Sequence, residues 1–122
     1  MTFLAESTAE LRKQARIGNL ARALFAQAFA EMEVGDWIGA MREAEEAIRF
    51  AEETGSIVWT AAASIVKAKV AGMQGSLERS EEYASQAERL VLSSGASFLL
   101  AMLQMARGVA AIGGGQIGRA HV

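Results

Sequence analysis

Residues 35–55 read GDWIGAMREAEEAIRFAEETG, and this stretch decides the fold. A glycine stands at each end, and Asp36 is a residue type that caps helix N-termini through its side-chain oxygen. Apolar residues between the glycines recur every three or four positions, with charged residues on the opposite side, which predicts an amphipathic helix ending at Gly55. The apolar stripe consists of Trp37, Ala40, Met41, Ala44, Ala47, Ile48 and Ala51.

The same plan recurs along the whole chain. Gly35, Gly75 and Gly115 are 40 residues apart, and so are Gly55 and Gly95. A period between roughly 20 and 50 residues is typical of a solenoid, in which each unit buries its apolar face against its neighbours. We therefore expect residues 1–122 to form a single all-α domain of stacked helical hairpins.

Apolar helices are expected to alternate with the acidic ones. The sequence predicts apolar helices over residues 19–34, 56–74 and 96–112, with a third turn at the glycines 113–115. Residues 3–16 are interpreted as the second helix of a preceding hairpin, and a possible capping box at Ser7 and Glu10 would set a later start. The expected architecture is two full hairpins with a half-hairpin at each end.

Charge follows the same alternation. The segments 35–55 and 75–95 are acidic, whereas 56–74 and 96–122 contain only basic charged residues. This predicts one acidic and one mildly basic layer of helices. The net charge of −2 argues against direct nucleic-acid binding, which normally needs a concentrated basic face.

Composition and hydropathy restrict the classes further. The chain has no cysteine, which excludes disulfides and cysteine-based zinc sites. Its most apolar run, residues 96–112, is 17 residues long and contains Arg107, so it is shorter than the roughly 20 residues that span a bilayer. We expect a cytoplasmic protein without a membrane segment.

The motifs that could indicate catalysis lack their required context. Residues 113–118 match GxGxxG, but a predicted helix precedes them and no acidic residue follows. Ser64 and Lys67 match SxxK without the companion motifs, and His121 is the only histidine. The glutamates of residues 43–53 are interleaved with arginines, as on a solvated helix face. We therefore predict no enzyme activity, no cofactor and no metal site.

One set of residues has a possible binding role. In stacked hairpins the first helix of each pair lines the concave face, and flexible methionines beside aromatic rings suit a groove for a peptide or partner helix. Packing of the core between hairpins is the commoner role of such residues, and both interpretations stay open. The candidate partner-binding residues are Phe25, Phe29, Met32, Ile65, Met73, Met102 and Met105, with Lys69 as a basic neighbour.

Small residues hold fixed places in the repeat. The pattern G-x4-A-x3-A-x2-A that begins at Gly35 recurs as G-x4-S-x3-A-x2-A from Gly75. This resembles the skeleton of tetratricopeptide repeats, in which small residues let the two helices of a hairpin approach closely. The 40-residue period exceeds the usual 34 or so, which implies longer helices in a right-handed tetratricopeptide-like superhelix. A small residue also stands seven positions before each turn glycine: Ala28, Ala68 and Gly108.

Four runs resemble a more specific family. Residues 17–24, 35–47, 51–55 and 103–114 together resemble the helical-repeat region of LuxR-type, MalT-like regulators that carry an ATPase domain. The order in that family is ATPase, helical repeats and a DNA-binding helix-turn-helix. Residues 1–122 contain no Walker A motif and no recognisable helix-turn-helix, so the resemblance implies a central fragment.

The resemblance also implies a function. A module of this kind would bind a small-molecule inducer or a protein partner and relay its occupancy to the ATPase and DNA-binding parts of the regulator. The alternative is a free-standing tetratricopeptide-type adaptor that binds a peptide. The run 96–112 is apolar nearly all round, so we also expect its exposed flank to drive self-association.

Overall fold

The computed structural model describes the backbone of residues 2–120 and the side chains of residues 6–112. Residues 2–120 contain five helices and no strand, which confirms the all-α class. Within this range, none of the helices combines the length and the apolar character that crossing a bilayer demands. The helices are α1 (Thr2–Glu33), α2 (Trp37–Glu53), α3 (Ile57–Met73), α4 (Leu77–Ser94) and α5 (Ser97–Ala120).

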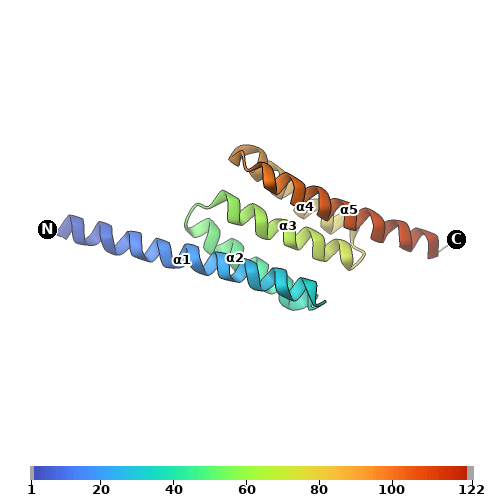
Figure 1. The fold of residues 1–122 in the computed structure, drawn as a ribbon, viewed down its shortest axis with the longest axis horizontal. Coiled ribbons are helices and arrows are strands. Elements are labelled where there is room, and N and C mark those ends of the chain that lie inside the picture. The colour runs from blue at the N-terminus through green and yellow to red at the C-terminus, as the bar shows by residue number, and fades with distance from the viewer. Residues whose placement is uncertain (1, 121–122) are drawn as a thin grey trace.

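The helices form two layers with α3 at the centre. The first layer contains α1, α3 and α5 side by side, and α2 and α4 lie behind it (Figure 1). α3 packs against all four other helices, whereas the described backbones of α1 and α5 do not approach each other closely, and neither do those of α2 and α4. The chain therefore folds as the hairpins α1–α2 and α3–α4, followed by α5 beside α3.

The predicted turns at four glycines are confirmed. Each of these glycines has a positive φ between 70° and 86°, a conformation that other residues rarely adopt, and each ends a helix. They are Gly35, Gly55, Gly75 and Gly95.

Side-chain caps begin two of the following helices. The Asp36 carboxylate accepts a hydrogen bond from the Gly39 N–H at 3.0 Å, and the Ser56 hydroxyl accepts one from the Trp59 N–H at 3.3 Å. Ser76 occupies the same position before α4, but its side chain makes no capping hydrogen bond. Asp36 therefore caps α2 as expected. Ser76 lies at the expected N-cap position of α4, but its side chain does not cap the helix.

Two predicted breaks are wrong. α1 is a single helix, so residues 3–16 form no separate helix and Ser7 lies within α1 instead of at a helix start. The N-terminal half of α1 extends beyond the other helices (Figure 1) in place of the expected half-hairpin. α5 likewise continues through the glycines 113–115, where a third turn was expected. Neither segment contains a proline, so nothing removes a helical backbone hydrogen bond.

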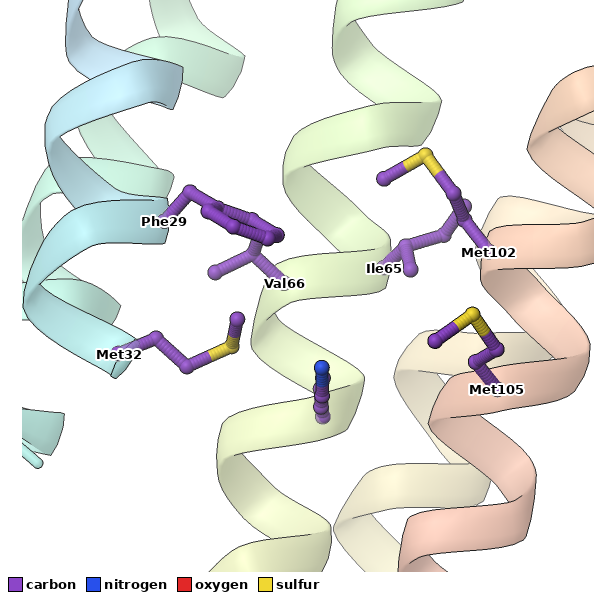
Figure 2. Close-up of a pocket in the computed structure, with 7 residues that line it drawn as sticks. Phe29, Met32, Ile65, Val66, Met102 and Met105 are labelled. Carbon is purple, nitrogen blue, oxygen red and sulfur yellow. The ribbon is translucent and has the colours of Figure 1, made fainter. Parts of the chain in front are cut away.

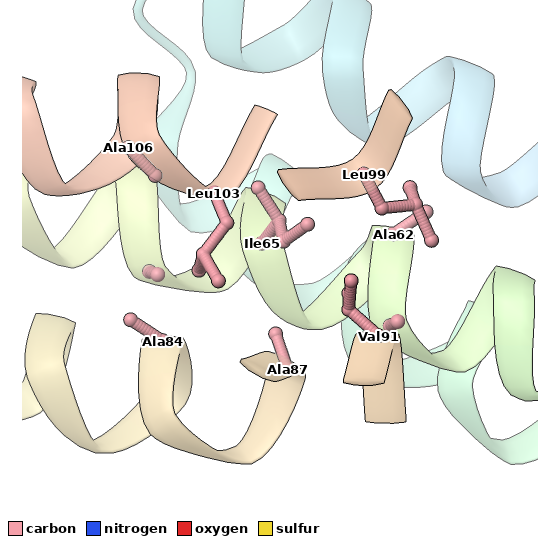
Figure 3. Packing of buried hydrophobic residues seen from close by; sticks show 10 residues of the cluster. Ala62, Ile65, Ala84, Ala87, Val91, Leu99, Leu103 and Ala106 are labelled. Atoms are coloured by element: carbon pink, nitrogen blue, oxygen red, sulfur yellow. The ribbon is translucent and has the colours of Figure 1, made fainter. Parts of the chain in front are cut away.

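The core divides into two clusters that share α3. Small alanines let the helices approach, and a few larger residues fill the remaining space. One cluster joins α3, α4 and α5 (Figure 3), and its labelled members are Ala62, Ile65, Ala84, Ala87, Val91, Leu99, Leu103 and Ala106. The other joins α1, α2 and α3, and it contains Ala28, Met32, Ala40, Ala44, Val66 and Val70.

Close helix crossings lie where the small residues of the repeat predict them. Ala28 and Ala68 are fully buried, and the Ser80 hydroxyl of α4 donates to the Ala68 carbonyl of α3 at 2.8 Å. Gly108, the third residue of this series, is exposed because no described helix packs on that side of α5.

Candidate functional site

An apolar groove runs along the layer formed by α1, α3 and α5. It consists of two cavities of about 270 and 300 Å³ that share Phe29 and Met102 as lining residues. α3 supplies the floor, because it lies between α1 and α5 and contacts both. We refer to these two adjoining cavities together as the central groove.

Three of the seven residues that line the first cavity are methionines. Figure 2 shows Phe29 and Met32 extending from α1, and Met102 and Met105 from α5, towards Ile65 and Val66 of α3. Methionine is flexible and polarisable, so its side chains adapt to an irregular apolar surface. The lining residues are Phe29, Met32, Ile65, Val66, Lys69, Met102 and Met105.

Four of the eight residues that line the second cavity are aromatic. The centroid of the Phe25 ring lies 5.5 Å from that of Trp59 and 6.4 Å from that of Phe29, in tilted arrangements that aromatic pairs favour. The rings thus form a continuous apolar wall between α1 and α3. The lining residues are Phe25, Phe29, Val58, Trp59, Ala62, Phe98, Leu99 and Met102.

The walls of the central groove expose apolar area, whereas its floor is buried. Met105 and Phe98 on α5 are 64% and 62% exposed, and Phe29 on α1 is 39% exposed. Ile65 and Met32 retain only 3% exposure each, since they also belong to the two core clusters. The exposed wall residues are therefore the ones whose remaining surface a bound molecule could bury.

The structure brings together most of the candidate residues named from the sequence. Six line the first cavity, and Phe25 lines the second. Met73 does not line either cavity. It is the last residue of α3 and packs against the core cluster formed by α1, α2 and α3. The core-packing interpretation therefore describes Met32 and Ile65, which are buried. The groove interpretation describes Phe29 and Met105, which form exposed walls.

The sequence interpretation missed part of the aromatic cavity. The missed residues continue the helical spacing of those that were named, because Ile65 and Lys69 follow Ala62 and Val58 on one face of α3. Extending the stripes of α3 and α5 towards their N-termini would have found five of these six residues, and Val66 lies next to Ile65. The six missed residues are Val58, Trp59, Ala62, Val66, Phe98 and Leu99.

Two cations lie against the rings of the central groove. The Lys69 ammonium is 6.0 Å from the centroid of the Phe29 ring, and the Arg22 guanidinium carbon is 5.6 Å from that of Trp59. Such cation–π contacts stabilise exposed cations by about 0.5–1 kcal/mol. Among the side chains that the structure describes, no carboxylate forms an ion pair with either cation.

Other cations of this layer pair with the acidic helices behind it. Arg107 of α5 lies 2.9 Å from a Glu81 oxygen and 2.6 Å from a Glu88 oxygen, both on α4. The hydrogen bonds from Arg107 hold the pKa of Glu81 below its ordinary value, and both carboxylates raise the pKa of Arg107. The complementary charges expected of the two layers thus meet at the α4–α5 contact.

Lys67 is also engaged between the layers. Its ammonium lies 3.8 Å from a Glu45 oxygen of α2 and 4.4 Å from the centroid of the Tyr83 ring of α4. Arg79 donates a hydrogen bond to the Tyr83 hydroxyl, which raises the pKa of Arg79 above its ordinary value. These contacts direct Lys67 away from the central groove, so Lys69 is the α3 cation that lines it.

The described side chains do not assemble the catalytic motifs considered above. Ser64 donates its hydroxyl to the Thr60 carbonyl at 2.9 Å, while the ammonium of Lys67 pairs with Glu45. Within residues 6–112, no histidine, aspartate and glutamate side chains gather in a group that could hold a metal ion. His121 and the side chains of residues 113–118 lie outside the described part of the structure.

No protein-family model, curated protein or solved structure that was compared with this chain matches it. The central groove is therefore interpreted from its own geometry.

Proposed function

We propose that this chain is a non-enzymatic helical-repeat module that binds an apolar segment of a partner protein in the central groove. The observation that carries the proposal is the set of exposed Phe29, Phe98 and Met105 side chains on two helices that face each other across α3. Exposed apolar surface that is contiguous and concave commonly marks a binding site. The only charged group in the lining is the Lys69 amine, which suits recognition more than acid–base chemistry.

The arrangement of helices supports a tetratricopeptide-like interpretation of the repeat. The order of contacts is that of stacked hairpins, in which each first helix lies beside the next first helix. Small residues occupy the crossings, as at Ala28 and Ala68. We propose that a right-handed superhelix of this kind presents the central groove on its concave side.

The resemblance to LuxR-type regulators supports a more specific setting. We propose that the module acts in the cytoplasm and relays occupancy of the groove to an ATPase and a DNA-binding domain of the same protein. Sequencing the DNA on either side of the coding region tests this setting. Reading frame that encodes a nucleotide-binding domain and a helix-turn-helix is the expected result. Stop codons that bound a free-standing chain would favour the adaptor alternative.

Binding in the groove can be followed through Trp59. The chain has two tryptophans, and Trp37 lies outside the groove, so Trp37→Phe leaves Trp59 as the only indole reporter. The probe is a synthetic 15-residue peptide with leucines on one helical stripe. We expect saturable binding of one peptide per chain, with a blue shift of Trp59 emission as water leaves the groove.

A matched pair of substitutions locates the binding surface. Met105 is 64% exposed in the groove and Leu92 is 69% exposed outside it, so each is replaced by glutamine in the Trp37→Phe background. Burying a methionine side chain contributes about 1.5–3 kcal/mol, and the two-thirds still exposed would contribute about 1–2 kcal/mol. We therefore expect Met105→Gln to weaken the peptide about tenfold and Leu92→Gln to leave it unchanged. Equal effects of the two substitutions would refute the assignment.

A further inference from the structure

The helices that line the central groove carry an uneven charge. α3 contains Lys67 and Lys69 but no acidic residue, and α5 contains Arg107 and Arg119 but no acidic residue. Nine of the thirteen glutamates lie on the other layer, five in α2 and four in α4. The remaining four lie in α1, at Glu6, Glu10, Glu31 and Glu33. A molecule that enters the groove therefore meets cations and no carboxylate on the α3 floor and the α5 wall.

Two cations beside the central groove, Lys69 and Arg22, are available to pair with a bound anion. Lys67 and Arg107 are paired with glutamates of the opposite layer. Lys69 and Arg22 form no ion pair with a described side chain, and each lies near an aromatic ring. Glu31, the acidic residue of α1 nearest in sequence to Phe29, is directed towards Gly39 of α2. Lys69 and Arg22 therefore lie beside apolar surface without a carboxylate partner, which is where an opposite charge on a ligand is most favourable.

Arg22 and Lys69 lie near the two ends of a stretch of α3 that is long enough for a short bound helix. Arg22 lies over Trp59, and Lys69 is ten residues further along α3. Ten residues of α-helix span about 15 Å, or nearly three turns. α1 and α5 both pack against α3, and their side chains line the groove from its two sides. A bound helix could lie over α3 between them.

The apolar lining determines which form of chain can bind. The backbone groups of α1, α3 and α5 are engaged within their own helices, so the floor offers no row of hydrogen-bond partners. An extended peptide would leave its backbone groups unpaired against this floor, at a substantial cost. A helix satisfies its own backbone and can present apolar residues at positions i, i+3, i+4 and i+7.

We infer that the partner segment is an acidic amphipathic helix whose carboxylates, about ten residues apart, pair with Lys69 and Arg22 while its apolar stripe fills the central groove. This inference rests on the proposed function and specifies the chemistry of the partner. Charge complementarity selects the segment and its position, and the apolar contacts provide most of the affinity.

The test compares two peptides with the same leucine stripe and opposite charges. One carries glutamate at the two flanking positions ten residues apart, and the other carries lysine at both. Binding is measured through Trp59 emission of the Trp37→Phe protein, and peptide helicity is measured by circular dichroism. We expect the glutamate peptide to bind about tenfold more tightly at low salt and to become helical, with the preference decreasing as salt rises.

Charge reversals in the protein have matched controls. Lys69→Glu is compared with Lys13→Glu, and Arg22→Glu with Arg49→Glu, so each pair changes the net charge equally. Lys69→Glu should abolish or invert the preference for the glutamate peptide, whereas Lys13→Glu should leave it unchanged. Lys69→Gln removes the charge without placing a carboxylate beside Phe29, and its helical circular dichroism verifies that the fold is retained.

The outcomes separate this inference from the proposed function. If both peptides bind alike, or if Lys13→Glu acts like Lys69→Glu, the charge-based inference is wrong and the groove proposal stands. If neither peptide changes Trp59 emission, both are wrong. Saturable binding of dodecanoate in place of the peptides would indicate a small apolar carboxylate ligand. A change of Trp59 emission with protein concentration alone would indicate a second copy of the chain. Either of these results would overturn the inference.

Discussion

Replacing Gly72 by alanine should destabilise the protein, although the same change usually stabilises a helix. Gly72 lies inside α3, and a Cβ atom there would be 2.9 Å from the Ala110 Cβ and 3.0 Å from the Ala110 Cα. These neighbours belong to the backbone and the first side-chain atom of α5, so they cannot rotate away. Alanine at this position would require α5 to move away from α3.

The magnitude follows from two opposing contributions. Alanine is favoured over glycine within a helix by about 1 kcal/mol, whereas extra atoms in a well-packed site cost about 1–3 kcal/mol. We expect Gly72→Ala to lower the free energy of unfolding by about 1 kcal/mol net. Gly108 is the matched control, because it lies in α5 with nothing within 4 Å of its Cβ position. Gly108→Ala should raise the stability by about 0.5–1 kcal/mol.

Urea unfolding and thermal unfolding, both followed by helical circular dichroism, measure the stability of both variants. The Tm should fall for Gly72→Ala and rise for Gly108→Ala, by about 4 °C for each kcal/mol. Adding Ala110→Gly to Gly72→Ala removes the nearest methyl group, so a double-mutant cycle should give a favourable coupling of at least about 0.5 kcal/mol. If both alanine substitutions stabilise the protein equally, α3 and α5 do not approach as closely as the structure indicates.

Two other regions allow similar tests. Asp36→Ala removes the cap hydrogen bond to Gly39 and should cost about 1 kcal/mol, whereas Ser76→Ala should be close to neutral because Ser76 makes no cap bond. Comparable losses in urea unfolding would contradict this. Arg107→Gln removes the pairs with Glu81 and Glu88, both partly exposed, and should cost at most about 1 kcal/mol near neutral pH. Because the pKa of Glu81 is lowered in the fold, its stabilisation is present above the ordinary value of 4.5 and is lost as the pH falls below it. The stability difference between Arg107→Gln and wild type should therefore disappear in acid, and a difference that persists there would refute the assignment.

The first two turns could be predicted because a glycine that can end one helix is followed by a residue that can cap the next. Gly35 and Gly55 are each followed by a residue that can cap the next helix, and Asp36 and Ser56 do so. Gly115 has the correct place in the period, but Gln116 follows it and supplies no such cap. The period alone therefore overstates how many turns there are. A following cap residue is not required either, because Gly95 turns the chain although Ala96 follows it.

The continuous phase of the apolar stripe indicates that α1 is one helix and not two. Ile17, Ala21, Leu24 and Ala28 follow one another at helical spacing across Gly18, so the helix continues in register. A single glycine within a helix costs only about 1 kcal/mol, which the packing of one continuous face can offset. A true break changes the phase of the stripe, and none occurs here.

The groove depends on how far each side chain is covered, and spacing alone does not determine this. Met32 and Phe29 are both named by the same helical pattern, yet Met32 is 3% exposed and Phe29 is 39% exposed. The difference arises because Met32 packs on Ala40 and Ala44 of α2, whereas Phe29 lies on the side of α1 that faces the open space over α3. Periodicity can place a residue on the correct helix, but only the positions of three helices together show whether it forms core or an accessible wall. The same reasoning explains Met73, since the end of α3 lies over the α1–α2 hairpin and its last side chain is covered there. A repeat sequence therefore predicts the layer that holds a binding surface better than it predicts which of its apolar residues a partner would touch.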